Sequence, residues 1–329
     1  MIKPLSNIIL NFILSVFWLW CSVAIYFILL PYVDWAVFIS VAFVCVIPLI
    51  FFLLPQRKLA LLLIVLAYIA VLFGWNNMQP SNDRIWMPSV AKNPYAITQG
   101  NQVSVHNIRN FDYQTEHDFI QNYYDKTYNL DELETLSFIL SYWDGGTKVA
   151  HTILSFGFKN GDYLAVSAET RLELGEPQEL IQGFFNQYEM LYVLADERDV
   201  IRLRTNLRKE EVFLYPTRVS KENVRKVFDV IMTRVNKLHQ QPEFYNTLTQ
   251  NCFTALRADL STIAPPKNLW DWRVLANGYA DQMLYESKDI DTDLSFIEAK
   301  QYFHINQYVS ADNSPENFSQ KIRPNLYRQ

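Results

Sequence analysis

Cys252, the one cysteine after residue 75, is the residue whose type and setting best suit covalent chemistry. Of the three cysteines in the chain, Cys21 and Cys45 lie within long apolar stretches, where a thiol usually serves as a small apolar side chain. Cys252 follows the polar sequence TLTQN and opens a stretch that predicts a helix. A thiol at a helix start faces backbone N–H groups, so we expect a lowered pKa and a nucleophilic thiolate. A buried structural cysteine is the alternative.

A thiolate nucleophile needs a base, and His151 is the best-placed histidine to act as one. It lies in VAHTILSFGF (residues 149–158), which predicts a strand, on the face shared by Val149 and Ile153. The other histidines lie in polar or aromatic surroundings or at a helix end: His106, His117, His239 and His304. We therefore expect His151 to be the general base, with a satisfied core histidine as the alternative.

A third group that orients the imidazole could come from the next strand, residues 162–169. The two strands meet at the Asn-Gly pair of residues 160–161, which predicts a hairpin turn. A two-residue turn directs Glu169 away from His151. A three-residue turn, with the glycine in a bulge, sets the two residues opposite one another with Cβ atoms about 5 Å apart. Glu169 is the third catalytic residue only with the second turn; otherwise we expect a surface charge paired with Arg171.

Acyl transfer also needs hydrogen-bond donors for an oxyanion. We expect them to be the backbone N–H of Cys252 and the side chain of Asn251. The sequence lacks the motifs of metal and nucleotide chemistry, namely H-E-x-x-H, C-x-x-C and a Gly-rich phosphate loop, and it has no G-x-S-x-G elbow. We therefore expect no metal and no bound cofactor.

The elements that must position these residues follow from the hydrophobic patterns. Alternation predicts strands at 102–108, 149–158, 162–169, 189–195 and 211–215, whereas 132–143 suits a strand or a helix. Helical spacing then predicts a helix capped by Ser220, followed by helices at 251–262 and 272–287. Strands followed by helices predict an α+β domain over residues 101–329. Residues 79–100, rich in Pro, Asn and Ser, are expected to be a linker.

Three uncharged apolar stretches, residues 7–31, 35–54 and 59–75, are long enough to cross a membrane as helices. We expect residues 1–78 to be a membrane anchor. Basic residues precede the first stretch (Lys3) and separate the second from the third (Arg57 and Lys58). The positive-inside rule then predicts a cytoplasmic amino terminus and delivers the remainder to the opposite side, the periplasm of a Gram-negative bacterium.

Charge excludes one class of partner. The 254 residues after residue 75 carry 26 basic and 33 acidic side chains. A domain with this net negative charge has no electrostatic footprint for a phosphate backbone, so we expect no binding of nucleic acid.

Four stretches together carry a family resemblance: HNIRNF (106–111), AHTILSFGF with DYLAVSAETR (150–171), ADERDVIRLRT (195–205) and EFYNTLTQNCFTAL (243–256). Over roughly residues 85–300, the chain resembles the amino-terminal periplasmic domain of Lnb-type lipoprotein N-acyltransferases. The resemblance implies a circularly permuted papain-like (NlpC-type) fold, with an antiparallel sheet, packed helices and histidine before cysteine. In that family, the membrane helices follow the domain, whereas in this chain they precede it.

The resemblance further implies a Cys–His acyl-transfer site. His151 and Cys252 match the family's histidine and cysteine, and Glu169 and Arg171 match its S-x-E-x-R segment, where we expect Arg171 to support the site. We expect a thioester acyl-enzyme in the inner membrane that moves a fatty acyl group from a phospholipid or lipoprotein ester to a lipoprotein's amino-terminal amine. The alternatives are a peptidoglycan- or lipid-directed cysteine hydrolase, and a membrane-tethered binding module without enzymatic activity.

Overall fold

The computed structural model describes residues 2–143, 145–261, 263, 271–309 and 317–323. Contacts divide the chain into two compact units. The first comprises Met1–Pro80 and Glu179–Gln187, and the second comprises Ser81–Gln178 and Tyr188–Gln329. A short segment that lies between two strands of the second unit in the sequence therefore packs with the first.

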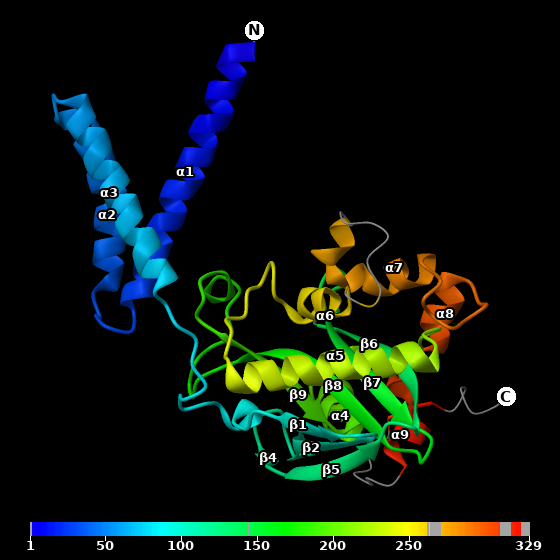
Figure 1. Cartoon of the computed structure of the whole chain (residues 1–329). Helices are drawn as coiled ribbons and strands as arrows, with labels where there is room; N and C mark the ends of the chain where they lie inside the picture. Colours follow the sequence, from blue (N-terminus) through cyan, green and yellow to red (C-terminus); the bar gives the residue numbers. More distant parts are fainter. Residues whose placement is uncertain (1, 144, 262, 264–270, 310–316, 324–329) are drawn as a thin grey trace. The chain divides into compact units, whose positions relative to one another are not determined.

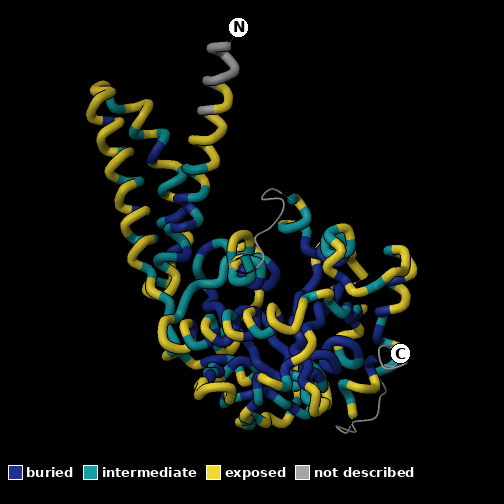
Figure 2. Tube along the Cα trace, turned by 45° about the vertical axis from the view of Figure 1, so that its right-hand side comes forward, coloured by how far each residue is buried: buried dark blue, intermediate teal, exposed yellow. Residues whose placement is uncertain are grey.

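The first unit contains three long apolar helices, α1 (Ile2–Leu29), α2 (Ala36–Leu53) and α3 (Arg57–Asn76). All three are long and apolar enough to span a membrane, which confirms the three expected spans. Most of their apolar side chains are exposed (Figure 2), as expected for surfaces that contact lipid instead of a protein core. Pro48 lies within α2, where its ring interrupts one helical hydrogen bond.

The second unit is built on an eight-stranded sheet in the order β1-β2-β9-β8-β7-β6-β10, with β5 paired to β2 (Figure 1). Neighbouring strands are antiparallel, except for β2 and β9, which are parallel at their one described pair. The strands of this sheet are β1 (Tyr95–Gln99), β2 (Gln102–Arg109), β5 (Tyr123–Asn129), β6 (Leu133–Tyr142), β7 (Ala150–Phe158), β8 (Tyr163–Arg171), β9 (Glu189–Ala195) and β10 (Glu211–Pro216). A separate ribbon joins β3 (Asp112–Tyr113) and β4 (Phe119–Ile120).

Helices cover both faces of the sheet and enclose two hydrophobic clusters. On one face lie α5 (Lys221–Gln240) and α6 (Cys252–Leu260), and on the other lies α4 (Glu197–Arg202) (Figure 1). The expected cap at Ser220 is confirmed, because its side chain accepts a hydrogen bond from the Asn223 N–H. The remaining helices are α7 (Ala280–Glu286), α8 (Phe296–Tyr302) and α9 (Phe318–Lys321). Short helical turns are η1 (Pro88–Val90), η2 (Gln182–Phe184), η3 (Leu203–Leu207), η4 (Trp272–Val274), η5 (Asn277–Tyr279) and η6 (Asn306–Tyr308).

The β7–β8 hairpin takes the three-residue form of the two turns left open by the sequence. Ile153 pairs with Ser167, and the Phe158 N–H donates to the carbonyl of Asp162 across the turn. Gly161 has a φ of 86°, a left-handed conformation that glycine adopts without steric cost. This register places the backbone of residue 169 level with that of residue 151.

The structure corrects two expectations about the elements. Residues 95–99, expected within a linker, form β1, because the Asn236 side chain and strand β2 satisfy their backbone. The single helix expected at 272–287 is instead η4, η5 and α7. The expected helix is broken near Gly278. The N–H of this residue donates to the Lys148 carbonyl in the β6–β7 connection, and not to a carbonyl of the preceding helical turn. The uncertain segment 132–143 is strand β6.

The close approach at Gly278 predicts a large effect of a single methyl group. A Cβ atom there would lie 2.3 Å from the carbonyl oxygen of Thr147, so we expect Gly278→Ala to reduce the free energy of unfolding by about 1–3 kcal/mol. Thermal unfolding of the full chain in detergent measures this change. Gly146→Ala is the matched control, since its Cβ would lie 3.3 Å from the nearest atom. Equal melting temperatures for the two variants would contradict the close approach.

Candidate functional site

The three side chains expected to do the chemistry, Cys252, His151 and Glu169, line one pocket of about 420 Å³ in the second unit. Its lining combines apolar side chains with charged groups. The apolar lining residues are Met87, Pro88, Val90, Tyr113, Phe119, Trp143, Ala168, Leu172, Leu203 and Tyr245, and the charged ones besides Glu169 are Arg109, Glu116, Glu176, Arg204 and Arg208. The pocket therefore suits a substrate with an apolar part and a polar reacting group.

Cys252 is the first residue of α6 because Asn251 caps that helix. The Asn251 Oδ1 atom accepts hydrogen bonds from the N–H groups of Phe253 (3.0 Å) and Thr254 (2.9 Å), and the Thr254 hydroxyl accepts one from the Asn251 N–H. The Asn251 Nδ2 atom donates to the Thr247 carbonyl at 3.0 Å. Both ends of this side chain are thus engaged in the helix start, and Asn251 is not among the described lining residues of the pocket. Its expected role as an oxyanion donor stays a prediction.

The Cys252 sulfur lies against the backbone of the residue that precedes the histidine. Its Sγ is 3.9 Å from the Ala150 carbonyl oxygen and 3.7 Å from Nδ2 of Asn277. The Asn277 side chain also accepts from the Ala150 N–H (3.0 Å) and donates to its carbonyl (2.7 Å). One buried amide therefore connects α6 to the first residue of β7. Asn277 was not identified from the sequence. The one available signal was the Asn277-Gly278 pair, which is unusual inside a segment expected to be helical.

The imidazole of His151 is held by a hydroxyl instead of directly by a carboxylate. Its Nε2 atom lies 2.6 Å from Oγ of Ser167, which donates to Oε1 of Glu169 at 2.8 Å. The direct distance from Nε2 to Oε1 is 3.8 Å. Since the Ser167 proton goes to Glu169, the hydroxyl oxygen accepts from Nε2–H, and the lone pair of the imidazole resides on Nδ1.

Burial and nearby arginines set the charges of this group. Burial would raise the pKa of Glu169, but the cations of Arg109 and Arg204 lower it to about 2. The Arg204 guanidinium donates to Glu169 Oε1 at 3.2 Å. Burial, and then the charge of Arg204, lowers the pKa of His151 to about 3. At neutral pH, the imidazole is therefore neutral and Glu169 is ionised.

The thiol does not have the lowered pKa that its position at a helix start suggested. Burial raises the pKa of Cys252, and this effect outweighs the opposite influence of the Thr152 and Phe253 N–H groups. Only 8% of Cys252 is exposed. In the described part of the chain, its sulfur makes no hydrogen bond to the imidazole of His151, which is directed to Ser167. The resting state is a neutral thiol beside a neutral imidazole.

Arg171 supports the pocket wall and does not reach its interior. Its guanidinium donates to the carbonyls of Val90 (3.1 Å) and Ala91 (2.9 Å) and to the Asn82 side chain (2.9 Å), and it lies over the Trp86 ring at 4.2 Å. It thereby fixes the segment that supplies the Val90 wall. The alternative ion pair between Arg171 and Glu169 is corrected, because Glu169 pairs with an arginine of η3 instead.

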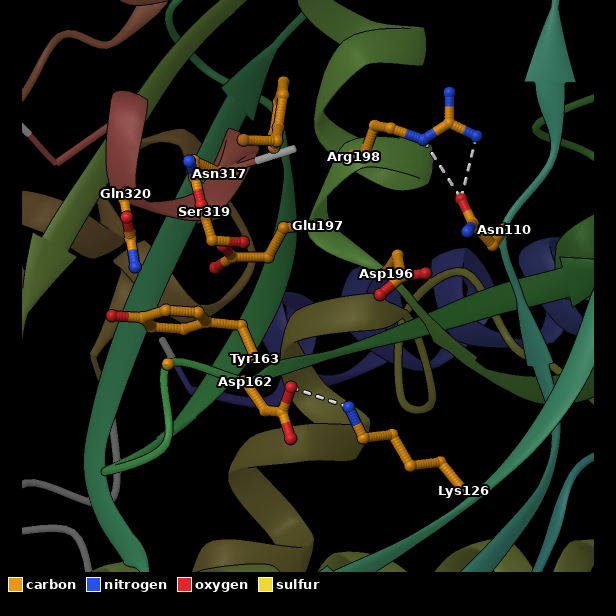
Figure 3. A pocket seen from close by; sticks show the side chains of 12 residues that line it. Asn110, Lys126, Asp162, Tyr163, Asp196, Glu197, Arg198, Asn317, Ser319 and Gln320 are labelled. Carbon is orange, nitrogen blue, oxygen red and sulfur yellow. Dashed lines mark hydrogen bonds and ion pairs between the residues drawn. The ribbon is translucent and has the colours of Figure 1, made fainter. Parts of the chain in front are cut away.

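A second pocket, of about 210 Å³, is polar (Figure 3). Lys126 forms an ion pair with Asp162 at 2.6 Å there, and Arg198 donates to the Asn110 side chain. No cysteine or histidine occurs among its described lining residues. It therefore offers no alternative setting for thiol chemistry.

Residues 119–278 match the family model of the Lnb N-terminal periplasmic domain. The matched region includes His151, Glu169, Cys252 and Asn277. No curated protein and no solved structure matches the chain. The match and the three apolar helices fit a membrane protein with a periplasmic domain.

The buried, neutral imidazole predicts a specific sensitivity to acid. An unfolded chain binds a proton at His151 near pH 6.5, whereas the folded chain binds it near pH 3. Stability is therefore lost as the pH falls from about 6.5 towards 3, by up to about 1.4 kcal/mol per pH unit for this group. We expect His151→Gln to show a smaller fall in melting temperature between pH 6.5 and 4.5 than the native chain. The exposed pocket residue His117, changed to Gln, is the control, and an unaltered fall in His151→Gln would argue against the buried neutral state.

Proposed function

We propose that the chain, whose residues 119–278 match the family model of the Lnb N-terminal periplasmic domain, is a membrane-anchored Cys–His acyltransferase of the bacterial inner membrane. The supporting observation is that Cys252 and His151 line one pocket with apolar walls. The basic residues around the three helices favour a cytoplasmic amino terminus and a periplasmic enzyme domain.

The reaction begins with proton transfer from the Cys252 thiol to Nδ1 of His151. The thiolate attacks the carbonyl carbon of a fatty acyl ester, and the carbon–oxygen bond to the alcohol breaks as the imidazolium returns its proton to the leaving oxygen. The acyl group is then a thioester on Cys252. An amine attacks this thioester, His151 accepts the amine proton, and the departing sulfur recovers it as a thiol.

Donors near the sulfur are available for the oxyanion of both steps. The Cys252 N–H is one. The Asn277 Nδ2 group is the second, in the place first expected for Asn251. It donates one hydrogen to the Ala150 carbonyl and directs the other to the Cys252 sulfur at 3.7 Å, next to the position that the oxyanion would take. Removing one such donor typically reduces kcat by about 10²–10³-fold.

Because Cys252 and His151 are both neutral at rest, we expect the site to become reactive only when substrate is bound. Proton transfer to His151 creates a buried imidazolium, which Glu169 stabilises through the Ser167 hydroxyl. Arg204 opposes that charge. A substrate that excludes water and brings a developing oxyanion near the sulfur shifts the balance towards transfer.

The apolar wall supports a lipid substrate, and a lipoprotein with a free amino terminus is the acceptor that we propose. The charged residues that line the same pocket favour one alternative, a cysteine hydrolase that passes the acyl group of a more polar substrate to water. The products separate the two: an N-acylated amine supports the transferase, and free acid in the presence of amine supports the hydrolase.

The central prediction concerns the sulfur itself. After incubation with phospholipid or diacylated lipopeptide, intact-mass analysis should find one fatty acyl adduct, located on Cys252. Cys252→Ala should lose the adduct and at least about 10³-fold of the activity. Cys45→Ser, which alters the cysteine exposed in α2, should retain both. Full activity in Cys252→Ala would refute the proposed enzyme and favour a binding module.

Ser167 provides a finer test, because its hydroxyl links the imidazole to Glu169. We expect Ser167→Ala to lower kcat by about 5- to 150-fold, since an unsatisfied buried group costs about 1–3 kcal/mol. Ser155→Ala is the matched control: it removes a buried hydroxyl from β7 whose partner is Glu197, outside the pocket. Equal losses of kcat in the two variants would show that the effect comes from stability alone.

A further inference from the structure

Two exposed aliphatic side chains of the second unit, Ile85 and Leu174, lie next to each other. The Leu174 N–H donates to the Ile85 carbonyl at 2.7 Å. Ile85 is 74% exposed and Leu174 is 63% exposed. Together, these two neighbouring aliphatic side chains form a small exposed apolar surface.

The same short backbone pairing contributes to the wall of the pocket. The two segments are antiparallel. Two residues after Ile85 and two residues before Leu174, the Met87 N–H donates to the Leu172 carbonyl at 2.9 Å. Met87 and Leu172 both line the pocket that contains Cys252. An exposed apolar pair and an apolar pocket wall are therefore consecutive along one two-stranded ribbon.

Both chain segments of this ribbon lead within a few residues into the membrane unit. Ile85 lies five positions after Pro80, and Leu174 lies five positions before Glu179, the two points where the first unit is reached. Five residues of extended chain span at most about 18 Å. The ribbon is thus tethered on both of its strands to the unit that contains the membrane helices.

Within the first unit, the tethering segment 179–187 packs on the helices themselves. The Phe185 ring lies 5.2 Å from that of Phe27 and 5.8 Å from that of Trp75, between ring centroids. Phe27 is near the end of α1, and Trp75 is near the end of α3. Both helices run outwards in the orientation given by the basic residues, so these rings occupy the level at which aromatic side chains meet the outer interface.

We propose that Ile85 and Leu174 form a lipid-docking pair that inserts into the outer leaflet of the membrane and guides an acyl chain along Met87 and Leu172 to Cys252. The flanking charges are compatible with this position, because Arg84 is paired with Glu173 at 2.5 Å. The insertion of Ile85 and Leu174 into the membrane is argued from their exposure and their tethers to the membrane unit. That the guided molecule is a fatty acyl chain rests on the proposed acyltransferase function.

A fluorescence measurement tests the docking without reference to activity. In the full-length Cys45→Ala/Cys252→Ala background, Leu174→Cys is labelled with the environment-sensitive dye NBD and reconstituted into phosphatidylcholine vesicles. We expect a blue-shifted emission that is quenched by lipids carrying a 5-doxyl spin label. Ile297→Cys, on a side chain of α8 that is 71% exposed, is the control and should show neither effect. Equal behaviour of the two sites would overturn the docking.

Activity tests the guiding role. We expect Ile85→Asp/Leu174→Asp to lose at least 10-fold of its activity on a diacyl lipid in vesicles and to retain its activity on water-soluble p-nitrophenyl butyrate. Ile97→Asp/Ile297→Asp, two exposed aliphatic positions elsewhere, should retain both activities. Equal losses on the two substrates would overturn the guiding role. If Cys252→Ala remained active while the NBD signals stayed as expected, the proposed chemistry would fail and the docking would stand.

Discussion

The geometry of the site depends on how Asn277 holds the peptide groups of Ala150. Its side chain accepts from the Ala150 N–H, donates to the Ala150 carbonyl and reaches the Cys252 sulfur. Three elements that are distant in the sequence, β7, α6 and η5, meet at this amide. Since His151 is the next residue along β7, the same contact sets the position of the imidazole relative to the thiol. Loss of this amide would remove a hydrogen-bond partner from both of these buried backbone groups.

The second constraint is electrostatic. Burial holds both the thiol and the imidazole in their neutral forms, whereas Glu169 stays ionised beside Arg204. An exposed thiolate in an oxidising compartment is open to side reactions. A buried neutral thiol avoids them. In the proposed reaction this thiol requires a base at the moment of attack, and the linked His151, Ser167 and Glu169 side chains would meet that requirement, because they place a compensating negative charge behind the imidazole.

The sequence was informative where the physics is local and much less so where it depends on distant contacts. Apolar length predicted the three spans, and Ser220 with its helical spacing predicted α5. The Asn-Gly turn allowed two registers, because both accept glycine, and only packing across the sheet selects one. Asn251 has the residue type of an oxyanion donor and of a helix cap, and the cap prevails because two N–H groups at the helix start need an acceptor. The contact between Asn277 and Ala150 spans 127 positions, which no local pattern encodes.

The proposed chemistry requires His151 to act as the base for Cys252, and the rate of acyl-enzyme formation in a single turnover measures this step alone. Rapid mixing of the protein with an excess of acyl ester, followed by acid quenching and intact-mass analysis, gives the rate for the native chain and for His151→Gln. We expect a rate at least about 10²-fold lower in the variant, the usual contribution of a general base. Equal rates would contradict this role of His151, because the sulfur would then be acylated without the imidazole.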